Sequence, residues 1–540
     1  MEKEGRKVIQ TEKMGGKFNN FMAAAMLGFS MWGFPGCSTA GDDPFNGEIP
    51  GMSGDNSGNV GGGSAGSGDT PSFDSTITPW SGDKATDAAQ DKVGTDEDFY
   101  HEANTFTNKV TVKFADSDAT IESNNNKILC YKTGAYVTID MQTNSVSKTE
   151  IVLSGSSSDG ALKIYGDKKF KLTLNGVSLT SKRGPAINSQ DKKRMFVHLQ
   201  DGTSNYLTDN TSYTDDAYYL DKTASEDRKG CFFSEGSMLF SGTGVLAVAG
   251  KYKHGVVTDG YLWTRPGVTI AVTEAAANAI HVKGDSDDKI GVCINGGLIY
   301  ANVASTAGKG IKTDYNVEVK GGTLNLNTTG GAEYDKDEKD TSSASCIKTD
   351  GDVIISGGTL VLKSSGKGGK GINCDGALTV SGGSTTVTTT GAKFTYSSSL
   401  TSSPKGVKAD GDINITGGAL NIAASGSNDG AEALESKALL TLAVAKFTAM
   451  PTMMLSMLQK RSMSVAVKYM PMQSTTTVLT AMAPSPSPVV WSWLMAHLLL
   501  KAGLTATVAI GLRLTEASSL VLWHRAIFAL KLKHSKLLDL

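Results

Sequence analysis

Apolar and polar residues alternate with a period of two through the middle of the chain. Around one double glycine, the apolar positions are Ile413, Ile415, Leu420 and Ile422. The same arrangement recurs around the double glycines at 296–297, 321–322, 357–358, 382–383 and 417–418. A period of two puts alternate side chains on one buried face of a strand, and paired glycines allow a sharp turn. The pattern therefore predicts short strands joined by glycine corners.

The double glycines follow one another at steps of 25, 36, 25 and 35 residues. The two long steps contain insertions, at 331–345 and 393–404, so the basic unit is near 25 residues. Short strands repeated with such a period predict a solenoid, and no helical apolar stripe is present here to form a crossover helix. We expect an all-β fold, a right-handed parallel β-helix in which each repeat forms one coil. Weaker coils precede these repeats at 229–248, 254–272 and 278–302.

Stacked coils place equivalent positions roughly 5 Å apart, so a repeated residue becomes a column. Aligning the coils on their glycines gives three columns of charged residues. Column 1 contains Lys309, Lys370 and Lys405, with His254, Asn278 and Ser345 at the same position in other coils. Column 2 contains Lys312, Lys348 and Lys408, and column 3 contains Asp259, Asp314, Asp350, Asp375 and Asp410. Two interpretations remain open: alternating charges on a solvated turn, or a cationic strip that binds the carboxylates of a uronate polymer.

Composition divides the chain into four parts. Residues 1–36 have the charged start and short apolar run of a bacterial lipoprotein signal, with Cys37 as the expected lipidation site and ordinary secretion as the alternative. Residues 37–83 are rich in Gly and Ser and predict a disordered tether. Residues 84–437 form the expected β-helix, and 438–540 form a tail of different composition. The protein is therefore expected to be exported, to the cell surface, the outer membrane or the medium.

The stretch 184–210, "GPAINSQDKKRMFVHLQDGTSNYLTDN", is followed by repeats of the type GIKTDG…ISGGTL. Together they resemble a family of secreted parallel β-helix carbohydrate-binding proteins, with a likeness from about Thr107 to Lys437. The resemblance implies calcium-dependent binding of acidic polysaccharide on a fold like that of pectate lyases. Family members usually carry Asp where Lys309, Lys370 and Lys405 stand, so this chain departs from their pattern in the middle coils.

A calcium site is expected instead near the end of the repeats. Calcium prefers six to eight oxygen ligands, and carboxylates gather in the stretch "SNDGAEALESK" at 427–437. The expected ligands are Asp410, Asp429, Glu432 and Glu435. These residues are too few to enclose the ion, so a following coil would have to contribute.

No repeat is visible after Lys437, and only Gly503 and Gly511 of the 62 glycines lie beyond it. A shifted reading frame restores the missing pattern: residues 449–455 then permit Asn-Ala-Tyr-Asp-Asp-Ala, and 464–470 permit Ser-Gly-Gly-Lys-Val-Tyr. Our hypothesis is that a frameshift near Lys437 replaced the final coils and left the segment beyond about 440 poorly ordered. A separate helical domain, or a membrane helix at 489–512, is the alternative.

The leading functional hypothesis is a non-catalytic, surface-attached protein that binds acidic polysaccharide with the six column lysines, assisted by calcium. A polysaccharide lyase on the same scaffold is the first alternative, and a structural stalk or adhesin without a glycan ligand is the second. The net charge of −2 favours no nucleic acid partner. Five further cysteines and the scattered histidines form no metal or catalytic motif, so we expect them to be ordinary buried or turn residues.

Overall fold

The structure is a computed structural model that describes residues 95–214, 225–425, 430–442 and 446–449. The expected signal segment, Cys37, the tether, Asp429 and the tail from residue 450 lie outside these residues. The described elements are β-strands and one short 3-10 helix, η2 (His101–Ala103). No described helix is long and apolar enough to cross a membrane.

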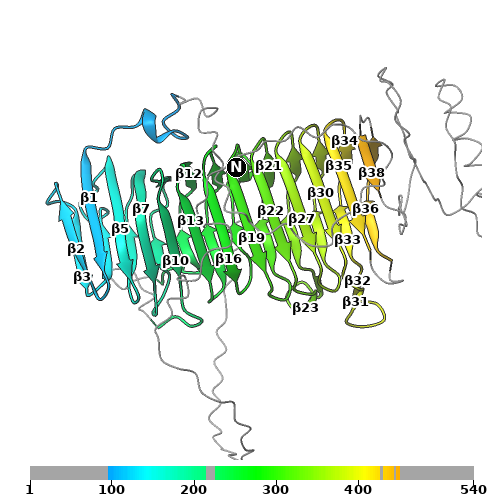
Figure 1. Ribbon diagram of the computed structural model, residues 1–540, viewed down its shortest axis with the longest axis horizontal. Helices are drawn as coiled ribbons and strands as arrows, with labels where there is room; N and C mark the ends of the chain where they lie inside the picture. Colours follow the sequence, from blue (N-terminus) through cyan, green and yellow to red (C-terminus); the bar gives the residue numbers. More distant parts are fainter. Residues whose placement is uncertain (1–94, 215–224, 426–429, 443–445, 450–540) are drawn as a thin grey trace, which may run out of the picture. The chain divides into compact units, whose positions relative to one another are not determined.

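Parallel strands stack coil upon coil, which confirms the predicted parallel β-helix (Figure 1). Each regular coil has three strands, and they define three faces. Face I is a 12-stranded sheet: β3 (Leu129–Thr133), β4 (Tyr136–Asp140), β6 (Ala161–Tyr165), β8 (Ile187–Ser189), β11 (Gly230–Ser234), β14 (His254–Thr258), β17 (Ile280–Val282), β20 (Lys309–Thr313), β25 (Ser345–Thr349), β28 (Lys370–Cys374), β33 (Lys405–Ala409) and β36 (Glu432–Ser436).

The other two faces share their strands at the N-terminal end. These strands are β1 (Asn108–Ala115), β2 (Asp118–Ser123), β5 (Thr149–Ser157) and β7 (Phe170–Thr180), and β2 pairs antiparallel with β1. Face II continues with β9 (Met195–Leu199), β12 (Met238–Gly242), β15 (Leu262–Thr264), β18 (Ile290–Ile294), β21 (Asn316–Val319), β26 (Val353–Ile355), β29 (Leu378–Val380), β34 (Ile413–Ile415) and β37 (Leu440–Leu442). Face III continues with β10 (Ser204–Thr208), β13 (Val245–Gly250), β16 (Thr269–Ala275), β19 (Leu298–Val303), β22 (Thr323–Thr328), β27 (Thr359–Ser364), β30 (Ser384–Thr389), β35 (Ala419–Ala424) and β38 (Lys446–Ala449).

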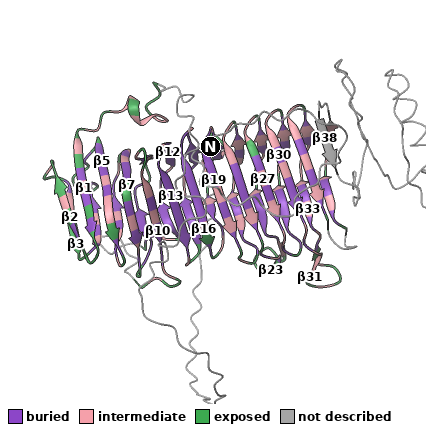
Figure 2. Cartoon of the chain, in the orientation of Figure 1, coloured by how far each residue is buried: buried purple, intermediate pink, exposed green. Residues whose placement is uncertain are grey.

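The core is built from columns of aliphatic side chains that point inward from each face. On face I, one such column joins strands β14 to β36 through residues in direct register: Val256, Ile280, Ile311, Ile347, Ile372, Val407 and Leu434. All of them are buried. Exposed residues gather at the N-terminal hairpins and in the turns (Figure 2). The continuous apolar column explains why the alternating pattern predicts the fold so well.

The double glycines form the corner between faces II and III, as the sequence predicts. At Gly418 the backbone has φ of +72°, a conformation that other residues adopt only at a cost. At Gly417 a Cβ atom would lie 2.3 Å from the carbonyl oxygen of Ser381 in the preceding coil. The first glycine is therefore required by close stacking of the coils, and the second by backbone geometry.

Both insertions fold as small hairpins in the turn between faces III and I. The first contains β23 (Glu333–Asp335) and β24 (Asp340–Ser342), and the second contains β31 (Phe394–Thr395) and β32 (Thr401–Ser402). Figure 1 shows both hairpins at the same edge of the coil stack. They extend beside the first residue of the face I strands, where column 1 lies.

Residues 95–107 form a strap that crosses the outside of face II. Phe99 packs edge-on against Trp263, with ring centroids 4.8 Å apart, and Tyr100 packs edge-on against the same ring at 5.7 Å. Arg265 donates two hydrogen bonds to the Glu102 carboxylate, at 2.8 and 3.0 Å. The strap thus covers apolar residues that would otherwise face water.

The coil stack extends past the boundary that the sequence pattern places at Lys437. Strand β37 pairs in parallel with β34, from Ile413↔Leu440 to Ile415↔Leu442, and β38 pairs with β35 up to Ile422↔Ala449. Lys437 therefore lies within a coil and not at its end. The pattern obscured this coil because no double glycine occupies its corner.

Candidate functional site

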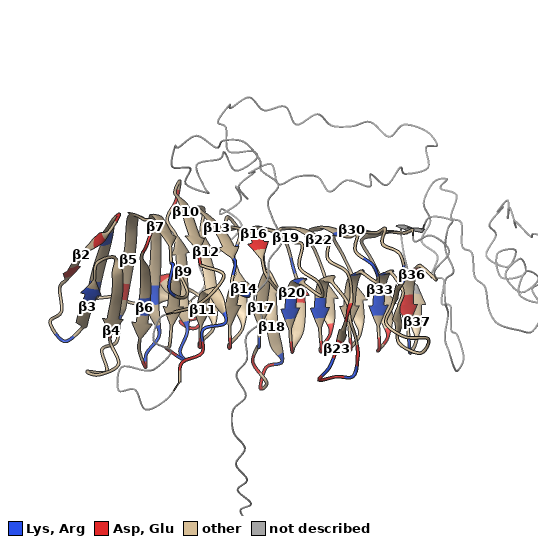
Figure 3. Cartoon of the chain, turned by 90° about the horizontal axis from the view of Figure 1, so that it is seen from below, with Lys and Arg blue, Asp and Glu red and all other residues tan. Residues whose placement is uncertain are grey.

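The strand register brings the predicted lysines into two columns on face I. In column 1, Lys309 pairs with Ser345, then Lys370 and Lys405 follow, and Glu432 is the last member within the described residues. In column 2, the successive residues are His281, Lys312, Lys348, Asn373, Lys408 and Glu435. In Figure 3 the ribbon is blue, for Lys and Arg, on β20 and β33, and red, for Asp and Glu, at β36. The strand register thus confirms that the residues predicted for columns 1 and 2 lie in line.

The column 2 lysines are paired with the aspartates that follow each strand. The ammonium of Lys312 lies 3.1 Å from Asp314, and that of Lys408 lies 2.9 Å from Asp410. Lys348 contacts Asp350 at 2.9 Å and also Asp375 of the next coil at 2.8 Å. Column 2 is therefore a strip of alternating charges, which is the first of the two interpretations that the sequence left open.

Lys348 illustrates how neighbouring coils compensate a lysine on this face. Burial alone would lower the pKa of Lys348, but hydrogen bonds to Asp375 and Asp350 outweigh it and raise the pKa. Its side chain is only 16% exposed. A ligand carboxylate would have to compete with two aspartates for this ammonium.

Lys370 is buried beneath both insertion hairpins and cannot contact a polymer. Its ammonium donates to the hydroxyls of Ser343 and Ser402, at 2.6 and 2.7 Å, and to the Gly368 carbonyl at 3.2 Å. Only 6% of the residue is exposed. The expectation that Lys370 belongs to an accessible binding strip is therefore corrected, because Ser343 and Ser402 come from insertions that a repeat alignment skips.

The environment of Lys370 lowers its pKa from 10.5 to about 7, through burial first and then through repulsion from Lys408 and Lys405. A lysine with such a pKa suits a general base in lyase chemistry. Proton abstraction requires contact with the substrate, however, and the hairpins cover this amine. The geometry of Lys370 therefore gives no support to the lyase alternative.

Lys309 is the column 1 lysine that stays half-buried and forms no ion pair within the described residues. Its ammonium donates to the Ser342 hydroxyl at 2.9 Å, and its backbone N–H donates to the Asn278 side-chain oxygen at 3.0 Å. Burial lowers its pKa to about 8, and repulsion from Lys312 adds to this effect. Near neutral pH this group is still mostly charged and can bind an anion.

The carboxylates predicted to bind calcium are engaged by lysines instead. Lys405 lies between Glu432, at 2.7 Å, and Glu435, so one ammonium forms an ion pair with both carboxylates. Asp410 contacts Lys408 and Lys437, whose hydrogen bonds lower its pKa although burial opposes this. The described residues contain no group of three or more His, Cys, Asp or Glu side chains placed to hold a metal. These residues, without Asp429, do not fit a calcium ion, since an ammonium holds the position between the carboxylates.

Two histidines extend the face I columns above Lys309. The rings of His254 and His281 stack with centroids 4.5 Å apart and an interplanar angle of 13°. Burial, with mutual repulsion, lowers the pKa of His254 to about 2, and burial lowers that of His281 to about 4. Both rings are therefore neutral at pH 7, and the cationic part of the columns begins at Lys309 and Lys312.

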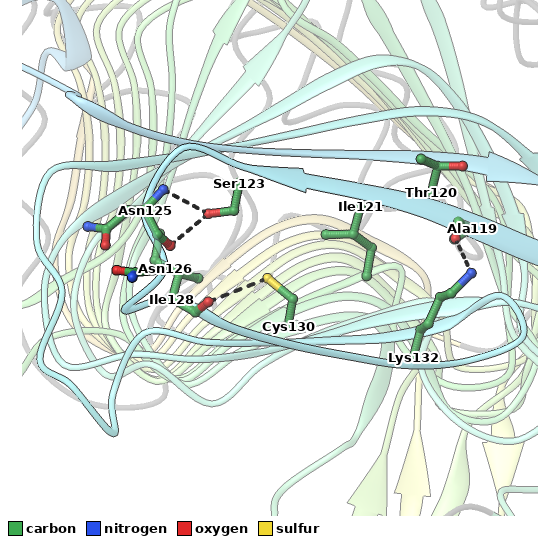
Figure 4. Close-up of a pocket in the computed structure, with 9 residues that line it drawn as sticks. All are labelled: Ala119, Thr120, Ile121, Ser123, Asn125, Asn126, Ile128, Cys130 and Lys132. Carbon is green, nitrogen blue, oxygen red and sulfur yellow. Dashed lines mark hydrogen bonds between the residues drawn. The ribbon is translucent and has the colours of Figure 1, made fainter.

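One cavity of about 500 Å³ lies away from these columns, at the N-terminal end between β2 and β3. Figure 4 shows its lining, in which Lys132 donates to the Ala119 carbonyl and Ser123 bonds with Asn125. Lys132 is also paired with Asp118 at 2.7 Å. The cavity has no convergent set of reactive groups, so we do not assign it a role.

Comparison with known proteins gives three matches. Residues 133–285 and 267–393 match the family described as carbohydrate-binding domain-containing protein. A relative of the same description from Acetivibrio thermocellus is 26% identical over 152 residues, which cover 27% of this chain and 51% of the relative. The chain thus spans about half the length of this curated relative.

Among solved structures, a gadolinium derivative of the polysaccharide lyase-like protein from C. thermocellum aligns with 57% of this chain and 96% of its own chain. The identity is 19% and the TM-score is 0.35. Over residues 133–393 the chain is similar in sequence to the family described as carbohydrate-binding domain-containing protein.

Proposed function

We propose that this protein binds a uronate-type polysaccharide along face I, without catalysis, at the edge formed by columns 1 and 2. The family match supports a carbohydrate ligand. The observation that carries the acidic specificity is Lys309, a half-buried ammonium whose hydrogen bond in the described structure goes to a neutral hydroxyl, that of Ser342. A ligand carboxylate stabilises such an ammonium more than it stabilises a lysine that already has an acidic partner.

The paired charges of column 2 suit the rest of a sugar chain. Lys312 and Lys348 each lie beside aspartates, so donors and acceptors alternate at the spacing of the coils, roughly 5 Å. Sugar hydroxyls both donate and accept hydrogen bonds, and such a strip can satisfy both roles. We therefore expect one strong carboxylate contact at Lys309, with hydroxyl contacts on either side.

This balance of charge has a consequence for salt dependence. Six uncompensated lysines would bind a polyanion with a steep dependence on ionic strength. Here Lys312, Lys348, Lys405 and Lys408 have acidic partners and Lys370 is covered. We therefore expect affinity to fall only modestly with added salt, as for a single partly buried charge pair.

Calorimetric titration of the protein with polygalacturonate tests the proposal, with fully methyl-esterified polygalacturonate as the neutral comparison. Replacing Lys309 by Met keeps the side-chain length but removes the charge. Loss of a charge-assisted hydrogen bond costs about 1.5–3 kcal/mol, or roughly ten- to a hundredfold in affinity. The matched control is Lys113→Met, which changes an exposed lysine on β1 far from the columns.

The expected result is binding of the acidic polymer by the parent and by Lys113→Met, with weak binding by Lys309→Met and weak binding of the esterified polymer. Equal affinity of Lys309→Met and the parent would refute the proposal. The titration is repeated with calcium and with EGTA, which tests the calcium dependence implied by the family resemblance. Ultraviolet absorbance from unsaturated products during long incubation would instead favour the lyase.

A further inference from the structure

Two exposed tyrosines lie at the same edge of the coil stack as the column 1 residues. Among the described residues, the exposed large hydrophobic side chains are Tyr131, Tyr252 and Tyr396, with exposed fractions of 50%, 43% and 56%. Tyr131 lies on β3 at the N-terminal end. Tyr252 and Tyr396 lie in turns that lead from face III to face I: Tyr252 shortly before β14, and Tyr396 in the hairpin of β31 and β32 that precedes β33.

Tyr396 belongs to a stacked pair formed by the two insertions. Its ring lies 4.2 Å from that of Tyr334, with an interplanar angle of 7°. Tyr334 is in β23 and Tyr396 directly follows β31, so each hairpin supplies one ring. The stack covers one side of Tyr396 and leaves more than half of the residue exposed.

Tyr252 belongs to a second stacked pair at the same edge. Its ring lies 3.9 Å from that of Tyr213, at an angle of 22°. The Tyr213 hydroxyl donates to Asp209 at 2.6 Å, and Arg228 lies 5.7 Å from the centre of the Tyr213 ring. These contacts hold the inner ring in place, while Tyr252 stays 43% exposed.

The two pairs lie on either side of the Lys309 position. Tyr252 precedes β14 and Tyr334 precedes β25, and the strands between them are β17 and β20. Three coil steps, about 15 Å along the stack, separate the coils that carry Tyr252 and Tyr334, the nearest members of the two pairs. Lys309 is the first residue of β20, between the two pairs, and Asn278 accepts a hydrogen bond from its backbone.

We propose that the two tyrosine pairs are stacking platforms for sugar rings, so that one polysaccharide chain extends from Tyr252 across Lys309 to Tyr396. The ligand is a polymer or oligomer of pyranose sugars several rings long. One face of a pyranose ring presents C–H groups, which pack on the electron-rich face of an aromatic ring, while its hydroxyls reach polar groups at the side. The proposal rests on the function proposed above and adds contacts that do not depend on ligand charge.

The experiment measures affinity for polygalacturonate and for a short oligogalacturonide with Tyr252→Ala, Tyr396→Ala and the double variant. Tyr131→Ala is the matched control, because that tyrosine is equally exposed but lies on β3. Tyr396→Phe keeps the ring and removes the hydroxyl. Thermal unfolding of each variant shows whether the coils are intact.

Each alanine variant is expected to bind the polymer about two- to tenfold more weakly. The two effects should multiply in the double variant, since the pairs are far apart and share no partner. For an oligomer too short to reach both platforms, the double variant should lose no more affinity than one single alanine variant does. Tyr131→Ala and Tyr396→Phe should bind as the parent does.

If both alanine variants fold and bind the polymer as tightly as the parent, the tyrosine pairs are not stacking platforms. If Lys309→Met still binds weakly in the same assay, the Lys309 proposal stands. Weak binding by Tyr396→Phe would also overturn the platforms, because the hydroxyl and not the ring face would then be responsible. If thermal unfolding shows that Tyr396→Ala disturbs the hairpins, the affinity of Tyr252→Ala alone tests the proposal, because Tyr252 lies in a separate turn. Absence of any polymer binding by the parent would overturn both proposals.

Discussion

Replacing Lys370 by Met should stabilise the protein at pH 7 and destabilise it at pH 10. The ammonium is buried among Ser343, Ser402 and the Gly368 carbonyl, without a carboxylate partner in the described structure. Burial lowers its pKa to about 7, whereas the unfolded chain has the ordinary lysine value near 10.5. Between these values the unfolded chain binds more protons, so the free energy of unfolding increases as pH rises from 7 to 10.5.

The size of the effect follows from this difference in pKa. At about 1.4 kcal/mol for each pKa unit, an interval from 10.5 to about 7 corresponds to roughly 5 kcal/mol of destabilisation at low pH. Methionine has a similar length and no charge, but it loses hydrogen bonds worth about 1–3 kcal/mol in total. The loss is limited because Ser343 and Ser402 remain 2.8 Å apart and can bond to each other. At pH 7 the folded amine is half protonated, so the penalty there is about 4 kcal/mol, and about 1 kcal/mol of it remains at pH 10. Lys370→Met should therefore gain about 1–3 kcal/mol at pH 7 and lose up to about 2 kcal/mol at pH 10.

Urea unfolding followed by circular dichroism, at both pH values, measures this reversal. Lys113→Met is the control, because an exposed lysine should change stability little at either pH. If the free energy of unfolding differs between the parent and Lys370→Met by the same amount at pH 7 and at pH 10, this explanation is refuted. Such a result would mean that Lys370 has the same pKa in the folded and the unfolded chain. It would also indicate that the hairpins do not close over column 1.

Four further predictions concern other parts of the chain. Because the pKa of Lys309 is about 8, affinity for polygalacturonate should fall as pH rises through 8, and Lys309→Arg should keep its affinity to higher pH; identical pH profiles would contradict this. Phe99→Ala removes an edge-on contact with Trp263, so hydrogen exchange of residues 95–107 should accelerate about two- to tenfold while β-helix peptides stay unchanged, and uniform acceleration would count against a separate strap. Cys37→Ala should move the protein from the membrane fraction to the soluble fraction of cells; an unchanged distribution would exclude the lipid anchor. Sequencing of the gene beyond codon 437 should reveal an inserted or deleted base, and stop codons in the alternative frame would disprove the frameshift.

Most of the fold could be predicted because its determinants are local and repeated. A period of two fixes which side chains point inward, and stacked coils bring every such position into register with its equivalent. The Ile311, Ile347 and Ile372 column follows directly from the spacing of the glycines. The corners also follow, since Gly417 and Gly418 are needed for close stacking and for a positive φ.

The state of the individual lysines could not be predicted in the same way. Lys309, Lys370 and Lys405 occupy equivalent positions in column 1, yet one donates to Ser342, one is buried under two hairpins and one lies between two glutamates. Their partners come from insertions and from neighbouring coils. A repeat alignment removes the insertions, so it removes the cause of the difference.

The aromatic rings at the turn edge were missed for a related reason. Tyr334 and Tyr396 are 62 positions apart in the sequence, in segments without any pattern, and they meet only because two hairpins bend toward each other. The strap is a similar case, because Phe99 precedes the coils and contacts Trp263 from outside.

The sequence by itself determined the coil: its strands, its glycine corners, its apolar core and the columns of repeated charge, all of which depend on the spacing between neighbouring residues. The tertiary structure decided which members of those columns are paired, covered or accessible, because electrostatic partners and burial depend on distances in space between coils and insertions. Lys309 and Lys370 carry the same side chain at the same place in the repeat. Only the folded hairpins make one a candidate ligand contact and the other a buried amine.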